Sequence, residues 1–64
     1  MFGEKVRQLR KDRGLSQETL AAMASFDRTY ISLVERGLRN LSLLNICRLA
    51  KALEVELSEL VEGL

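Results

Sequence analysis

The chain has 64 residues, 47% of them hydrophobic and 30% charged, with no proline, no histidine, one cysteine, four glycines and a formal net charge of +1. This composition excludes a disordered chain, and no uncharged stretch reaches the roughly 20 residues that span a bilayer. The length permits one domain, 1–64, which is expected to be all-α. Since the charged N-terminus lacks the apolar core of a signal peptide, we expect a cytoplasmic protein.

The first two predicted helices are short and amphipathic. Phe2, Val6 and Leu9 recur at helical spacing, which predicts a helix over residues 3–13. Ser16 stands immediately before a second apolar pattern, where its hydroxyl can cap the first turn of a helix.

A third helix follows a few turn residues later. Asp27 is placed to cap its first turn, and Gly37 is placed to end it in the left-handed conformation that glycine adopts easily. Two short capped helices separated by a tight turn are the layout of a helix-turn-helix that binds DNA. The sequence therefore predicts a central helix-turn-helix over about residues 16–37.

The third helix has two different faces. At about 100° per residue, Ile31 and Val34 share one side. Four polar residues and no acid share the other side: Arg28, Thr29, Ser32 and Arg36. Small hydroxyl side chains allow a close approach to DNA, and arginine can bind guanine with two hydrogen bonds. The alternative is an ordinary exposed face that happens to be basic.

The remaining chain predicts two further helices. Ser42 caps a fourth helix, and a short final turn covers about residues 57–62. The fourth helix is expected to bury one broad apolar arc made of Leu43, Ile46, Cys47, Leu49, Ala50 and Leu53. Cys47 is therefore expected to be a buried structural thiol.

Charge is distributed unevenly along the chain. Residues 1–40 carry eight basic and five acidic side chains, net +3, whereas residues 41–64 carry two and four, net −2. The basic half contains the predicted helix-turn-helix, so a polarised molecule is expected. The overall charge of +1 remains well below that of a strongly basic nucleic-acid binder.

The chain resembles the lambda-repressor-like, Xre-type helix-turn-helix family across nearly its whole length. The resemblance rests on Leu9-Arg10, Gly14-Leu15-Ser16-Gln17, Leu20-Ala21, Tyr30-Ile31-Ser32, Glu35-Arg36-Gly37, Arg39-Asn40 and Arg48-Leu49-Ala50-Lys51-Ala52-Leu53. Within the family, the stretch 27–32 with the pairs 35–36 and 39–40 is most similar to the controller proteins of restriction–modification systems. The family usually has glycine where this chain has Ser25, and frequently where it has Glu54.

The resemblance implies a compact five-helix fold with an internal ion pair. Glu35 falls beside the apolar arc of the third helix, where a half-buried carboxylate requires a cation. In the family this position pairs with the one that Arg10 occupies here. Two independent surface charges are the alternative.

The expected DNA contacts fall into two groups. Base edges are expected to be read by Arg28, Thr29 and Ser32. Phosphates are expected to be held mainly by Gln17, Tyr30, Arg36, Arg39 and Asn40. For Gln17 the alternative is a solvated helix start, and for Tyr30 a purely structural role.

We expect a homodimer, because so short a chain buries only about 60% of its unfolded surface. The expected interface is formed by the last turn, with Leu57, Leu60, Val61 and Leu64, and by neighbouring parts of the fourth helix. Such a dimer would bind a palindromic operator on double-stranded DNA and regulate transcription, as a repressor or controller protein.

Other functional classes are less consistent with the residues. The chain has one cysteine and no histidine, so neither a zinc site nor histidine-based catalysis is expected, and we predict no enzyme, cofactor, small-molecule ligand or membrane association. The alternative function is a protein-interaction module, such as a toxin-binding partner or an assembly subunit that keeps the fold, and the low net charge favours it.

Overall fold

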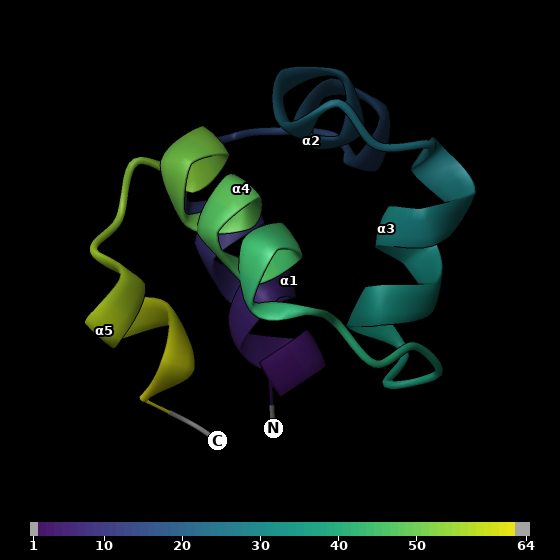
Figure 1. Cartoon of the computed structure of the whole chain (residues 1–64). Coiled ribbons are helices and arrows are strands. Elements are labelled where there is room, and N and C mark those ends of the chain that lie inside the picture. The colour runs from purple at the N-terminus through teal and green to yellow at the C-terminus, as the bar shows by residue number, and fades with distance from the viewer. Residues whose placement is uncertain (1, 63–64) are drawn as a thin grey trace.

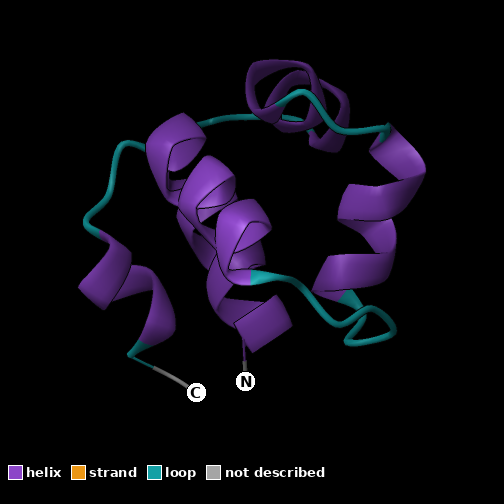
Figure 2. Ribbon diagram, viewed as in Figure 1, coloured by secondary structure: helices purple, strands orange, loops and turns teal. Residues whose placement is uncertain are grey.

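Five helices make up the computed structural model, which describes residues 2–62. They are α1 (Phe2–Asp12), α2 (Gln17–Ala24), α3 (Arg28–Glu35), α4 (Leu43–Leu53) and α5 (Leu57–Val61). Figure 2 shows helices joined by loops, with no strand in the described range. The predicted all-α, five-helix fold is confirmed, and no helix of residues 2–62 is long and apolar enough to cross a membrane.

The helices pack around one core, and each one makes its main contacts with two others. The main contacts join α3 to α1 and α2, α4 to α2 and α5, and α5 to α1. In Figure 1, α2 lies at the top and α3 on the right, on the side of the molecule opposite α5. The helix-turn-helix formed by α2 and α3 is thus supported by α1 and α4, and α5 packs on both of these helices.

Every helix supplies at least one fully buried side chain to this core. The largest are Val6, Leu20, Ile31, Val34, Leu49, Leu53 and Leu60. Burying each side chain contributes about 1.5–3 kcal/mol relative to leaving it in water. Ile31 and Val34 are 0% and 1% exposed, so α3 is fixed through the inner face that the sequence predicted.

Leu60 corrects one expectation about the dimer. It was expected to remain available to a partner, but its side chain is 0% exposed in the single chain. The five-residue helix α5 packs on both α1 and α4, and Leu60 is its one buried residue. Leu60 therefore belongs to the monomer core.

The predicted caps begin the helices where expected. The side chains of Ser16, Asp27 and Ser42 accept hydrogen bonds from backbone amides in the first turns of α2, α3 and α4. Each such cap contributes about 1 kcal/mol. The caps made by Ser16 and Asp27 fix the starts of the two helices that form the helix-turn-helix.

Two helix ends use residues that are unfavourable there. Ser25 and Glu54 have φ values of 60° and 58°, the left-handed conformation that follows α2 and α4. A residue with a Cβ atom costs about 1 kcal/mol or more in this conformation relative to glycine. Both helices therefore end in the left-handed conformation although neither residue is glycine.

Cys47 is exposed, so the expectation of a buried thiol is wrong. α4 buries Leu49, Ala50, Ala52 and Leu53. Cys47 precedes Leu49 by two residues, a rotation of roughly 200° around the helix, so it lies on the far side. The apolar arc predicted from the sequence is too broad, because the buried side of α4 consists of Leu49, Ala50, Ala52 and Leu53 alone.

Gly3 allows the first turn of α1 to approach the end of α3. A Cβ atom at this position would lie 2.5 Å from the carbonyl oxygen of Val34 and 2.7 Å from that of Glu35. Both atoms belong to the backbone, which cannot give way without moving the helix. The close approach helps to fix where α3 ends.

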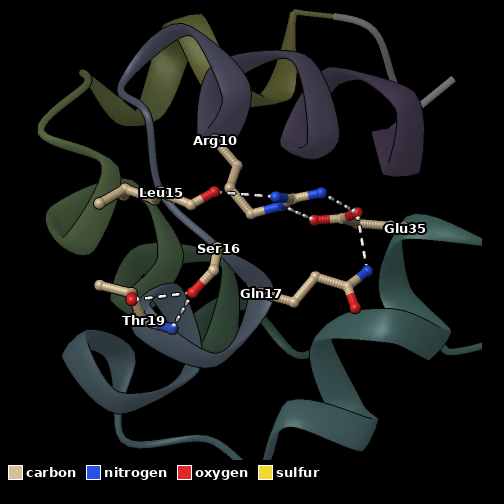
Figure 3. A network of polar contacts seen from close by, with 6 residues as sticks. All are labelled: Arg10, Leu15, Ser16, Gln17, Thr19 and Glu35. Carbon is tan, nitrogen blue, oxygen red and sulfur yellow. Dashed lines mark hydrogen bonds and ion pairs between the residues drawn. The ribbon is translucent and has the colours of Figure 1, made fainter.

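A nearly buried polar network joins α1, α2 and α3 (Figure 3). Arg10 Nε donates to Glu35 Oε2 at 2.6 Å, and Arg10 Nη2 donates to Glu35 Oε1 at 3.0 Å. Arg10 Nη1 donates to the carbonyl of Leu15, and Gln17 Nε2 donates to Glu35 Oε1 at 3.2 Å. The side chains of Arg10 and Glu35 are only 11% and 4% exposed.

Removing either member of the ion pair should destabilise the fold strongly. Arg10→Ala or Glu35→Ala leaves a nearly buried charge without its partner, so the free energy of unfolding in urea should fall by up to about 3–5 kcal/mol. The two losses should not add in the double variant. The exposed Arg7 on the same helix provides the matched control, and Arg7→Ala should change stability by no more than about 0.5 kcal/mol. Additive losses would show that Arg10 and Glu35 act independently.

Candidate nucleic-acid interface

The outer side of α3 and the residue that follows it present a basic face, made of Arg28, Thr29, Ser32 and Arg36. Arg28, Thr29 and Arg36 are exposed, and Ser32 is half-buried. The first turn of α3 contains no acidic residue. Guanidinium and hydroxyl groups are thus accessible on one side of a helix whose opposite side is locked into the core.

The start of α3 fixes where Arg28 and Thr29 lie. Asp27 has extended backbone geometry, and its Oδ1 accepts from Thr29 N at 2.8 Å. The carboxylate is thereby engaged in the cap and contributes to holding the first turn. Because a recognition helix contacts bases mainly through its N-terminal residues, Arg28 and Thr29 occupy the position that such contacts need.

The expected phosphate-binding residues occupy the start of α2, α3 and the loop after α3. Gln17 is half-buried and uses its Nε2 on Glu35. Arg39 and Asn40 are both exposed in the loop between α3 and α4. The network of Figure 3 therefore connects Gln17 with α3 through Glu35, whereas Arg39 and Asn40 are placed by the loop.

Tyr30, which is expected to bind phosphate, is also held by three contacts within the protein. Its ring centroid lies 4.7 Å from that of Phe26, and the guanidinium carbon of Arg39 lies over it at 5.8 Å. Its hydroxyl accepts a hydrogen bond from Asn45 Nδ2 at 3.1 Å. Tyr30 thus joins the helix-turn-helix to Arg39 and to α4.

Sequence reasoning missed Phe26, Asn45 and Arg48 as parts of this site. Arg48 donates to the carbonyls of Ala24 and Ser25 at the end of α2, and its guanidinium carbon lies 4.3 Å from the Phe26 ring centroid. A cation at a helix C-terminus is favourable, because the last carbonyl groups lack partners within the helix. Asn45 and Arg48 are polar and three residues apart on α4. This spacing places them side by side on the helix surface and was the available sign that they act together.

The dimer surface predicted from the last turn and neighbouring parts of the fourth helix is partly exposed. Leu57 is 37% exposed and Val61 is half-buried, whereas Leu64 lies outside the described residues. The most exposed large apolar side chains on α4 are Leu43 and Leu44, at 68% and 67%. Exposed apolar surface is therefore found at the start of α4 as well as on α5.

Comparisons with known proteins agree with this geometry. Residues 6–60 match the family model described as helix-turn-helix. Control protein C.BamHI of Bacillus amyloliquefaciens is 49% identical over 63 residues, which cover 97% of this chain and 78% of that protein.

Two solved structures are also similar. The restriction–modification controller protein C.AhdI from Aeromonas hydrophila has a TM-score of 0.90 and 56% identity, covering 92% of this chain and 89% of that chain. SinR, a master regulator for biofilm formation whose crystal structure was solved in complex with DNA, has a TM-score of 0.89 and 32% identity, covering 95% of this chain and 98% of that chain. The chain therefore belongs to the Xre-type helix-turn-helix family, and its relatives include the restriction–modification controller proteins.

Proposed function

We propose that this protein is a sequence-specific DNA-binding regulator of transcription, which acts as a homodimer on a palindromic operator and controls a restriction–modification system. The observation that carries the proposal is the exposed, acid-free basic face of α3, held in place by the core and by the Arg10–Glu35 pair. The similarity of the chain to C.AhdI and to DNA-bound SinR supports the same function.

Base recognition is assigned to the first half of the basic face. Arg28 can donate two hydrogen bonds to the O6 and N7 atoms of one guanine in the major groove. Thr29 and Ser32 are small enough to let the backbone of α3 approach the base edges, and their hydroxyl groups can donate or accept there.

Phosphate binding is assigned to the groups that surround this face. The start of α2 offers free backbone amides beside Gln17, which suit an anion. Arg36, Arg39 and Asn40 are exposed at or after the end of α3, and Tyr30 lies next to Arg39. Contacts of this kind fix the position of α3 in the groove without reading sequence.

Dimerisation is assigned to exposed apolar side chains of α4 and α5, chiefly Leu43, Leu44 and Leu57. A two-fold axis at this surface would place two copies of α3 about 34 Å apart, the distance between successive major grooves on one side of DNA. The acidic residues 41–64, net −2, would then lie between the subunits and away from the phosphates.

DNA binding is tested by fluorescence anisotropy with a random duplex at low salt. Binding should be micromolar or tighter and should weaken steeply as salt is added, because Lys and Arg release counterions from phosphates. The same protein should prefer a palindromic duplex obtained by selection from a random pool. Lack of binding to either duplex would instead support a protein-interaction module with this fold.

Arg28 and Arg39 should differ in their effect on specificity. Arg28→Ala should weaken binding to the selected duplex by about 1–3 kcal/mol and relax the preference at one base pair. Arg39→Ala should weaken binding to selected and random duplexes alike and reduce the salt dependence. Titrations of both variants against both duplexes measure this difference. If Arg28→Ala weakens binding to both duplexes equally, Arg28 does not read a base.

The dimer is tested by replacing exposed apolar residues with serine. Leu43→Ser, Leu44→Ser and Leu57→Ser combined should give monomers in light scattering and weaken operator binding by about 10²-fold or more, because the second half-site no longer adds to affinity. Met23 on α2 is 51% exposed, so Met23→Ser is the matched control and should leave the dimer intact. Unmodified protein that is monomeric at high micromolar concentration and binds operator one chain at a time would contradict the dimer.

A further inference from the structure

Asn45 is the residue of α4 that reaches the recognition helix through a side-chain hydrogen bond. Its Nδ2 donates to the hydroxyl oxygen of Tyr30 at 3.1 Å, across fifteen residues of sequence. The position of Asn45 is itself fixed, because its backbone amide donates to Ser42 Oγ at 3.2 Å in the cap of α4. The cap at the start of α4 therefore helps to hold the Asn45 side chain in place.

The ring that carries this hydroxyl is also held in place. Phe26 packs against it at 4.7 Å, with the two ring planes inclined by 36°. Arg39 covers it at 5.8 Å, and Arg48 fixes Phe26 from the other helix. The phenolic oxygen therefore has a defined location between α3, α4 and the loop that carries Arg39.

The direction of the hydrogen bond determines what the hydroxyl can still do. A phenolic oxygen carries one proton and accepts through its lone pairs, while an amide nitrogen only donates. When Asn45 Nδ2 donates, the Tyr30 proton must turn away from Asn45. Tyr30 is half-buried, and no other hydrogen bond of its hydroxyl is found within residues 2–62, so the proton has no acceptor in that range.

We propose that Asn45 is a positioning residue of the DNA interface, which directs the Tyr30 proton toward a phosphate oxygen by donating to the Tyr30 hydroxyl. The proposal rests on the proposed DNA-binding function and adds a specific role for a residue of α4. A hydroxyl held in one orientation loses less freedom when it binds than a freely rotating one. The same hydrogen bond connects α4, which carries the exposed Leu43 and Leu44, to the helix that enters the groove.

Two conservative variants test the role of the Tyr30 hydroxyl proton. Tyr30→Phe keeps the ring that contacts Phe26 and Arg39 and removes only the hydroxyl. Asn45→Asp keeps the side-chain shape but only accepts, so it takes the phenolic proton for itself. An acidic residue in the first turn of α4 also favours the helix, so this variant should fold, and circular dichroism melting checks both proteins.

The expected result is a coupled loss of affinity. Tyr30→Phe should bind the selected duplex about tenfold more weakly, the size of one hydrogen bond to a charged group. Asn45→Asp should weaken binding at least as much, since it also adds a negative charge. In the Tyr30→Phe background, Asn45→Asp should cost roughly tenfold less than it does alone, because only the charge effect remains.

Methylphosphonate substitution, which neutralises one phosphate of the duplex at a time, separates positioning from a structural role. The unmodified protein should lose affinity when the phosphate bound by Tyr30 is neutralised, whereas Tyr30→Phe and Asn45→Asp should lose nothing further there. Equal costs of Asn45→Asp in both backgrounds, or unchanged binding by Tyr30→Phe, would overturn the inference while leaving the proposed function intact. Unmodified protein that binds no duplex would overturn the proposed function itself.

Discussion

The Arg10–Glu35 ion pair is the interaction on which the placement of the recognition helix depends. Glu35 is the last residue of α3, and its carboxylate receives two hydrogen bonds from α1 and one from Gln17 of α2. A carboxylate that is only 4% exposed would be costly without these partners. The pair therefore orders three helices at one point, and Gly3 lets α1 come close enough to α3 for this packing.

A second set of contacts fixes the other side of α3. Two adjacent aromatic rings, Phe26 and Tyr30, lie between the guanidinium groups of Arg48 on α4 and Arg39 in the loop after α3. The two guanidinium–aromatic contacts contribute about 0.5–1 kcal/mol each at exposed sites. With the ion pair on one side and these contacts on the other, the basic face of α3 is presented by a largely preformed scaffold.

Much of the fold could be predicted from short-range patterns. The caps Ser16, Asp27 and Ser42 marked three helix starts, and the spacing of Ile31 and Val34 identified the inner face of α3. These signals are local, because a cap acts within one turn and helical periodicity acts along one helix.

The errors concern residues whose surroundings depend on tertiary packing. Cys47 and Leu60 both have apolar side chains, yet Cys47 is exposed and Leu60 is fully buried. Which side of α4 is covered, and how much of α5 reaches the core, depend on contacts between helices far apart in sequence. The same is true of Asn45, whose partner Tyr30 is fifteen residues away and is found only when α3 and α4 pack.

The most direct test of this account is amide chemical-shift mapping of the protein during titration with its selected duplex. Large shifts are expected at the start of α2, in the first half of α3 and at residues 38–40, with little change in the core residues of α5. Shifts confined to α4 and α5, with residues 28–32 unaffected, would contradict the claim that the basic face of α3 binds DNA.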